Sequence, residues 1–184
     1  FERYHLIDEP ATDWIADNLS KGGKLGYDPW LLTPGQVSRY AAACEQAGGT
    51  LVPVSTNPVD AVWNNQPPPP LAPVWCLDEA FTGETVAAKR RRIADGLSEA
   101  GEDAALLSAP DSIAWLLNVR GGDVPYTPYA LSFAIIHADA SVDWYVDSRK
   151  LMPDARALAG NEIRLRQPDD LGPTLDDLGE AGKT

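Results

Sequence analysis

Apolar residues in the N-terminal part of the chain alternate between helical and strand spacing. One helix face is marked by apolar residues at i, i+3, i+4 and i+7, namely Val37, Tyr40, Ala41 and Cys44. This helix is predicted to begin at Thr33, because a capping threonine, a proline and then Gln36 at the capping-box position follow one another there. A shorter stripe predicts a helix over 10–19, and strands are predicted over 24–28 and 50–54. This part of the chain is therefore expected to run helix–strand–helix–strand.

The C-terminal part carries enough strand and helix signals for a self-sufficient domain. Apolar runs bounded by turn residues predict strands over 74–77, 103–108, 129–137, 142–146 and 162–166. Helical spacing predicts helices over 82–100, 110–118, 151–158 and 171–178. Residues 120–123 should break the second of these helices, and 179–184 should be frayed. The tight connection at 139–141 predicts an antiparallel hairpin. Residues 74–184 are therefore predicted to be an α/β domain with a mixed sheet flanked by helices.

A proline-rich stretch lies between the two parts. Residues 57–63 could form a short capped helical turn, and Pro67–Pro70 favour polyproline II, a semi-rigid spacer of about 12 Å. Such a tract could be a ligand for an SH3-type domain. Its position between two structured blocks favours a domain linker over residues 57–73 instead.

Four consecutive basic residues, Lys89–Arg92, fall inside the predicted helix over 82–100. Four consecutive residues cover most of the circumference of a helical turn, so they cannot form one basic face. We expect the run to be solvent-exposed and paired with neighbouring carboxylates.

Composition and charge narrow the classes of partner. The chain has 184 residues, of which 44% are hydrophobic, which suits one domain or two small ones. The formal net charge of −12 disfavours nucleic acids and anionic membrane surfaces. No apolar run approaches the roughly 20 residues of a membrane helix. The first residues lack a signal-peptide pattern, and the missing initial Met suggests a fragment.

The residues that usually carry chemistry are sparse. The two cysteines, Cys44 and Cys76, are predicted to be free buried thiols in a reducing cytosol, which indicates a cytoplasmic protein. The two histidines, His5 and His137, lie far apart, and His137 at a strand end is expected to be structural or exposed. No metal-ligand spacing or nucleophile motif is present. We therefore predict no catalytic residue and no metal site in this chain.

A longer pattern nevertheless resembles a known family. The stretch Asp111–Pro125, with Asn118-Val119-Arg120-Gly121-Gly122-Asp123 at its centre, resembles the middle domain of Xaa-Pro aminopeptidases, the aminopeptidase P branch of the creatinase/prolidase superfamily (peptidase family M24). The resemblance extends, in matching order and spacing, over 25–29, 51–54, 57–63, 129–136 and 142–147. Two positions depart from the family pattern, Gly122 where Ser is frequent and Tyr126 where many members have His.

The resemblance implies a three-part enzyme, a metallo-aminopeptidase. Two creatinase-like α/β domains would precede a C-terminal "pita-bread" catalytic domain, in which two Asp, one His and two Glu hold two divalent metals, usually manganese. Such metals activate a water that cleaves the bond before a proline at position two of a peptide. The chain supplies none of these ligands. The resemblance therefore implies half of a creatinase-like domain I over 1–56, the linker over 57–73, and a creatinase-like domain II over 74–184.

The chain is thus expected to be a non-catalytic fragment that shapes substrate access and association. Its implied partners are its own catalytic domain, peptides with proline at position two, and a second copy in a homodimer. In the family, the loop after the Asn-x-Arg-Gly-x-Asp motif lies toward the catalytic cleft. The resemblance therefore implies a substrate-access loop at Asn118, Arg120, Gly121 and Asp123. The guanidinium of Arg120 could bind a substrate carboxylate or carbonyl. The alternative is an internal Arg120–Asp123 pair that pins the loop.

A stand-alone α/β module that binds a ligand or partner without peptidase activity is the competing hypothesis, since fold does not fix function. A deep pocket with convergent polar groups within 74–184 would favour that module. An open surface around 118–123 would favour the fragment. Creatinase- or prolidase-type activity in the parent protein is a third option, which differs only in the catalytic domain.

Overall fold

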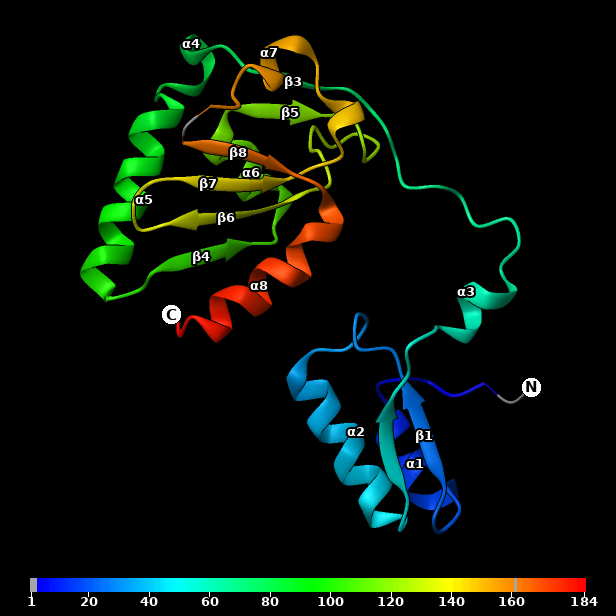
Figure 1. Ribbon diagram of the computed structural model, residues 1–184. Helices are drawn as coiled ribbons and strands as arrows, with labels where there is room; N and C mark the ends of the chain where they lie inside the picture. Colours follow the sequence, from blue (N-terminus) through cyan, green and yellow to red (C-terminus); the bar gives the residue numbers. More distant parts are fainter. Residues whose placement is uncertain (1–2, 161) are drawn as a thin grey trace. The chain divides into compact units, whose positions relative to one another are not determined.

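The computed structural model describes residues 3–160 and 162–184. The chain divides into two compact units, Phe1–Pro68 and Pro69–Thr184 (Figure 1). The first unit contains α1 (Ala11–Asn18), β1 (Lys24–Tyr27), α2 (Pro34–Gln46), β2 (Thr50–Pro53) and α3 (Pro58–Val62). The helix–strand–helix–strand order expected from the sequence is confirmed.

The first unit has a parallel two-stranded sheet. Strands β1 and β2 pair in a register that runs from Lys24↔Thr50 to Tyr27↔Pro53. The small core contains Ile15, Ala43 and Cys44, with Leu19, Leu25, Tyr40 and Leu51 packed against it. The predicted capping box is confirmed, because the Gln36 amide donates to Thr33 Oγ1 at 3.3 Å and the Thr33 amide donates to Gln36 Oε1 at 2.8 Å. Both cysteines are free, with Cys44 buried as expected and Cys76 only half-buried.

The second unit is built around a mixed four-stranded sheet in the order β4-β6-β7-β8. Its strands are β3 (Val74–Cys76), β4 (Ala104–Leu107), β5 (Val119–Gly121), β6 (Phe133–His137), β7 (Val142–Tyr145) and β8 (Ile163–Arg166). Its α-helices are α4 (Glu79–Thr82), α5 (Val86–Ala100), α6 (Pro110–Leu117), α7 (Pro153–Arg156) and α8 (Leu171–Glu180). Strand β6 is antiparallel to both β4 and β7, whereas β7 and β8 are parallel.

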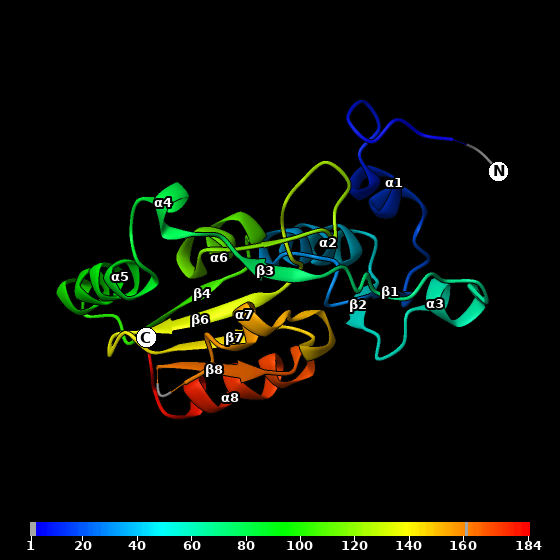
Figure 2. The same ribbon diagram turned by 90° about the horizontal axis from the view of Figure 1, so that it is seen from above.

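Helices cover both faces of this sheet (Figures 1 and 2). Because side chains alternate along a strand, Ile136 and Trp144 face α5 and α6 in the main core, while Ile135 and Tyr145 pack under α8. The predicted α/β domain with a mixed sheet flanked by helices, and the antiparallel hairpin before β7, are therefore confirmed. None of the helices in the described ranges has the length and apolar character needed to cross a membrane.

Several predicted boundaries were wrong, and the hydrogen bonds explain why. Helix α5 begins at Val86, because the Thr85 hydroxyl caps it by accepting from the Ala88 amide at 2.9 Å. Helix α6 does end before residues 120–123, as expected, but the sequence did not predict that 119–121 form β5 and pair antiparallel with β3. The tail expected to fray continues α8 to Glu180, and the Lys183 ammonium then pairs with Asp103 at 2.9 Å.

The expectation that the whole basic run is solvent-exposed was also wrong. Lys89 and Arg90 are only 2% and 5% exposed, whereas Arg91 and Arg92 lie on the surface. The Arg90 guanidinium donates to the Ala140 carbonyl at 2.7 Å and forms an ion pair with Glu162. Arg92 matches the expectation, with an exposed ion pair to Glu84 at 2.7 Å.

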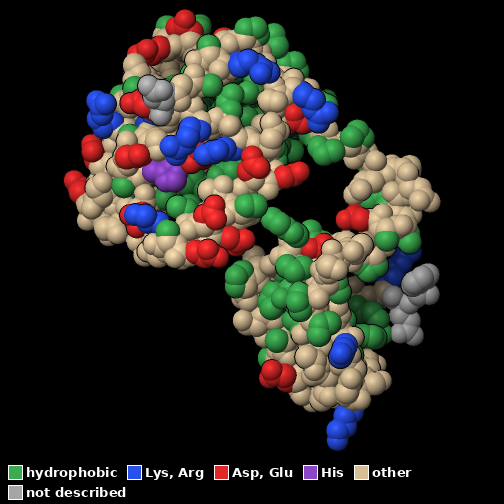
Figure 3. Space-filling view, in the orientation of Figure 1, with side chains coloured by type: hydrophobic (Ala, Val, Ile, Leu, Met, Phe, Trp, Pro, Cys, Tyr) green, Lys and Arg blue, Asp and Glu red, His purple; other side chains and the backbone are tan. Residues whose placement is uncertain are grey.

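The strand residue Asp143 is buried, and three side chains surround its carboxylate. Its carboxylate accepts from Arg164 Nε at 2.7 Å and Arg166 Nε at 3.0 Å, and lies 2.8 Å from His137 Nε2. Blue Lys and Arg side chains gather beside the purple His on this face (Figure 3). Burial alone would raise the pKa of Asp143, but the hydrogen bonds from Arg164, His137 and Arg166 outweigh it and hold that pKa well below its usual range. His137 is therefore structural, as expected.

Replacing Asp143 by Asn should destabilise the protein by about 2 kcal/mol at neutral pH, because the partly exposed Arg164 and Arg166 lose the buried carboxylate to which they donate. A depressed carboxyl pKa stabilises the fold above the unfolded-state value of about 3.9, and that stabilisation is lost as the pH falls below it. Asp143→Asn should therefore also flatten the loss of stability in acid. Urea unfolding between neutral and acid pH measures both effects. The surface variant Asp95→Asn serves as the control, and an unfolding curve like the control's would contradict the prediction.

Candidate functional site

The four residues predicted for the substrate-access loop lie along one continuous path. Asn118 ends α6, Arg120 and Gly121 belong to β5, and Asp123 follows β5 at the base of a loop over residues 122–130. The structure therefore brings them together in sequence order, with one anchor at each end of β5.

The first anchor is Asn118, which is only 6% exposed and caps α6 in the left-handed conformation with φ 52°. Its side-chain amide donates to the Glu84 carbonyl at 2.9 Å, and its side-chain oxygen accepts from Lys89 Nζ at 2.7 Å. Its backbone carbonyl accepts from the Leu77 amide at 2.7 Å. All of these groups are used within the fold, so Asn118 positions the chain rather than facing a ligand.

Lys89 completes this anchor from α5. Its ammonium donates to the Trp115 carbonyl at 2.9 Å and lies 4.6 Å from the centre of the Trp115 ring. A cation at the carboxyl end of α6 also complements the helix dipole. Burial lowers the pKa of Lys89, while Glu84 counteracts part of that effect. The sequence contained a signal for this contact, since Lys89 lies three residues after Val86 and four before Ile93, on the buried stripe of α5.

Between the anchors, β5 approaches its neighbours closely. The Arg120 guanidinium donates from Nη1 to the Val119 carbonyl at 2.8 Å and to the Ala114 carbonyl at 3.3 Å. A Cβ at Gly121 would lie 2.8 Å from the Ala130 amide nitrogen, closer than real Cβ contacts come. Position 121 therefore requires glycine so that the two sides of the loop can pack together.

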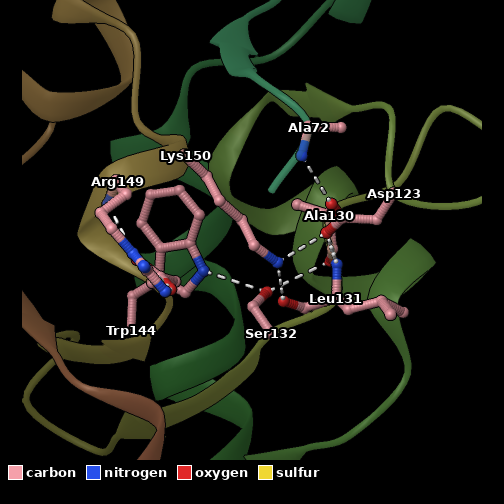
Figure 4. Close-up of polar contacts among 9 residues, drawn as sticks. Ala72, Asp123, Ala130, Leu131, Ser132, Trp144, Arg149 and Lys150 are labelled. Carbon is pink, nitrogen blue, oxygen red and sulfur yellow. Dashed lines mark hydrogen bonds and ion pairs between the residues drawn. The ribbon is translucent and has the colours of Figure 1, made fainter. Parts of the chain in front are cut away.

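The second anchor is a buried ion pair between Asp123 and Lys150 (Figure 4). The two side chains are 0% and 5% exposed, and Lys150 Nζ lies 2.8 Å from Asp123 Oδ2. The same carboxylate accepts from the Leu131 amide at 2.7 Å and from the Ala72 amide at 3.2 Å. Asp123 thereby joins the end of the proline-rich stretch, the loop and the segment before β6.

The alternative, an internal ion pair between Arg120 and Asp123, was wrong, because Asp123 pairs with a different cation. Among the described residues, the cation that pairs with Asp123 is Lys150, and Arg120 binds carbonyl groups instead. Lys150 lies in a short 3-10 helix, Ser148–Lys150, far from the motif in sequence. No local spacing linked Lys150 or Ala72 to the motif, so sequence reasoning missed both.

A cavity of about 730 Å³ lies beside this anchor, where the carboxyl ends of β4, β7 and β8 meet. Its polar side chains are largely bound to one another. Arg149 pairs with Asp147 at 2.6 Å and holds the pKa of Asp147 at about 2. Trp144 Nε1 donates to Ser132 Oγ at 3.2 Å, as Figure 4 shows. Tyr145 is an exception, because it lines the cavity and its hydroxyl is buried without a hydrogen-bond partner among the described residues.

Beyond Asp123 the chain forms a tight hairpin-like loop, the 122–130 loop. The Asp123 amide donates to the Tyr129 carbonyl at 3.2 Å, and the Thr127 amide donates to the Val124 carbonyl at 3.1 Å. At the tip, Tyr126 has a positive φ of 62° and a fully exposed side chain. The left-handed, non-glycine residue of this loop therefore lies at its middle position.

The residues of a metal site are not assembled here. Across residues 3–160 and 162–184, no group of three or more His, Cys, Asp or Glu side chains is arranged to hold a metal ion.

Replacing Asp123 by Asn should destabilise the second unit by about 3 kcal/mol, because the Lys150 ammonium would stay buried without a counter-ion. Urea unfolding measures the loss. Asp147→Asn removes the carboxylate of the exposed pair with Arg149 and should cost far less. Equal losses for the two variants would show that the buried pair has no special weight.

Replacing Tyr126 by Gly should stabilise the protein by about 1 kcal/mol, because glycine adopts a positive φ without steric cost. Tyr126→Ala keeps the strained backbone, and the exposed ring contributes little packing, so its stability should stay near that of the wild type. Thermal and urea unfolding compare the two variants. A Gly variant no more stable than the Ala variant would contradict the assignment of strain to this turn.

Comparison with known proteins identifies the fold's relatives. A sequence model of the creatinase/prolidase N-terminal domain matches residues 65–184. The chain is 37% identical to a probable Xaa-Pro aminopeptidase P of Colletotrichum graminicola, over 89% of this chain and 27% of that protein. It is 33% identical to aminopeptidase P1 of Lotus japonicus, over 87% of this chain and 24% of that protein.

A solved structure agrees with these matches. The crystal structure of X-prolyl aminopeptidase from Caenorhabditis elegans, described as a cytosolic enzyme with a di-nuclear active site, superposes with a TM-score of 0.82. The sequence identity is 27%, and the match covers 96% of this chain and 30% of that one. The chain spans about a quarter of the length of the curated relatives it matches. The resemblance seen in the sequence is confirmed, and the chain belongs to the creatinase/prolidase N-terminal domain family.

Proposed function

We propose that this chain is the non-catalytic N-terminal part of a metal-dependent Xaa-Pro aminopeptidase. The observation that carries the proposal is the similarity of this chain to known aminopeptidases P. Nearly the whole chain matches about a quarter of the length of each of these proteins. The remaining part of such a protein would contain the catalytic domain and remove the N-terminal residue before a proline. That part would hold two divalent metals, manganese by the family's usual preference, in a cytoplasmic enzyme.

The proposed domain organisation follows the resemblance. Residues 1–56 form part of a first creatinase-like domain, 57–73 the linker, and 74–184 a second creatinase-like domain. Support for the first assignment comes from the parallel β1–β2 pair, since two strands alone seldom make a stable sheet. Support for the last comes from the mixed sheet with helices on both faces.

The role proposed for the second domain is to shape access of peptides to the catalytic site. The 122–130 loop is held at its base by the buried Asp123–Lys150 pair and at the far end of β5 by Asn118. Gly121 lets the two sides of the loop pack closely. Arg120 binds carbonyl groups through Nη1. A guanidinium has further N–H donors, with which Arg120 would bind a substrate carboxylate or carbonyl. A loop fixed in this way would restrict which peptides reach the catalytic site, and it would lose little conformational entropy when a peptide binds.

The division of labour predicts that the isolated chain has no peptidase activity. Purified chain supplied with Mn²⁺ and the tripeptide Ala-Pro-Ala should release no alanine, whereas the full-length protein that carries it should. Release of the N-terminal residue is measured by mass spectrometry, with metal-free full-length protein as the control. Turnover by the isolated chain, or none by the metal-loaded full-length protein, would refute the proposal.

A further inference from the structure

The cavity of about 730 Å³ in the second unit lies where ligands of α/β sheets commonly bind. It sits at the carboxyl ends of β4, β7 and β8, which run in the same direction with β6 antiparallel between the first two. Its size falls in the range of small-molecule pockets, which enclose about 300–1,000 Å³. All the residues that line it lie within Pro69–Thr184, so the second unit alone supplies its walls.

Most of the cavity wall is apolar. Leu131 and Phe133 are 44% and 39% exposed and line the cavity beside the start of β6. The hydrogen bond from the Ala72 amide to Asp123 fixes the end of the proline-rich stretch against the second unit (Figure 4). Rings that pack face to face favour a flat partner, so this wall suits a flat apolar body. Four prolines complete it, namely Pro69, Pro70, Pro110 and Pro168.

The charged groups at the cavity are paired with one another. Arg149 pairs with Asp147 at 2.6 Å, and Lys150 pairs with Asp123 at 2.8 Å. Asp169 adds a further carboxylate to the lining. These groups carry no net positive charge, so they give the cavity no preference for an anion.

One polar group of the lining is left without a partner. Tyr145 is 0% exposed, and its hydroxyl forms no hydrogen bond with the residues that the structure describes. Burial raises the pKa of Tyr145, so the phenol keeps its proton at neutral pH. The Thr174 hydroxyl opposes part of that rise, but it donates its own proton to the Asp170 carbonyl at 2.8 Å. A buried hydroxyl without a partner is unfavourable, and an acceptor on a ligand would relieve it.

The amino end of α6 lies at the same cavity. The helix begins at Pro110, which lines the cavity together with Ser108, and no side chain caps it. Backbone N–H groups in the first turn of a helix have no intrahelical partner and favour acceptors. Asp111, the acidic residue of this first turn, lines a different cavity. The helix end therefore adds to the preference for an acceptor that Tyr145 creates.

We propose that this cavity binds a small uncharged molecule that has a flat apolar ring and a carbonyl oxygen. The ring packs against Phe133 and the prolines, and the carbonyl oxygen accepts the proton of the Tyr145 hydroxyl. The site uses residues of the second unit only, so it does not depend on the proposed peptidase function.

Calorimetric titration of this chain with three matched probes tests the class of ligand. Phenylacetamide carries both a ring and a neutral carbonyl, and it should bind with a Kd on the order of 1 mM. Phenylacetate keeps the ring but is charged, and it should bind at least about five-fold more weakly. Acetamide lacks the ring and should show no saturable binding in the same range. No saturable binding of phenylacetamide, or tighter binding of either other probe, would overturn the proposal.

The variant Tyr145→Phe tests the role of the hydroxyl. It should weaken the binding of phenylacetamide about five-fold, the effect of one hydrogen bond. Without ligand it should unfold in urea at the wild-type midpoint or above it, because it removes a buried hydroxyl that has no partner. Tyr126→Phe removes the hydroxyl of an exposed tyrosine outside the cavity and should change neither property. An unchanged affinity, or a midpoint for Tyr145→Phe below that of the control, would refute the role assigned to Tyr145.

The full-length protein that carries this chain separates a ligand site from a surface that another part of the protein covers. A ligand site should bind phenylacetamide in the full-length protein about as tightly as in the chain alone. Binding to the chain alone would show that the remaining part fills the cavity, and the inference would fail. Hydrolysis of Ala-Pro-Ala by the same preparation tests the proposed function separately, so either result can fail while the other holds.

Discussion

The buried ion pair between Asp123 and Lys150 is the constraint on which the candidate site depends. One carboxylate serves Lys150 and two backbone amides, those of Ala72 and Leu131. Burying two charges costs free energy that their attraction barely recovers, so the pair is a poor source of stability by itself. Its value lies in specificity, because an apolar contact could not fix the direction of two amides from segments so far apart in sequence.

At the opposite end of β5 a buried lysine, Lys89, is also bound by several acceptors, but none of those acceptors is a carboxylate. Lys89 is buried against neutral acceptors, namely the Trp115 carbonyl and Asn118 Oδ1, and the Trp115 ring covers it. The carboxyl end of α6 supplies part of the negative potential that a carboxylate supplies at Asp123. With both ends of β5 fixed, the strand pairs with β3 in one register, and the loop that follows leaves in one direction.

Local signals predicted those elements whose stability is local. The capping box at Thr33, the end of the helix predicted over 82–100 and the β6–β7 hairpin depend on neighbours in sequence, and the structure contains all three. Strand β5 was missed because its pairing with β3 joins segments more than forty residues apart, a separation visible in Val74↔Gly121. Lys89 and Arg90 were misjudged because charge was weighed above their place on the buried stripe of α5. Long side chains reach polar partners from such positions.

The polar residues of the motif and the most exposed residue of the loop are different residues. Polar residues in a glycine-rich turn suggest donors and acceptors for a substrate, but here the fold uses Asn118 and Asp123 to hold the turn itself. The exposed position falls to Tyr126, at a place where many members of the family carry His. Tyr and His share a flat ring and differ in charge and hydrogen bonding. Because buried pairs fix the frame, the geometry of the turn does not depend on which side chain occupies its exposed tip.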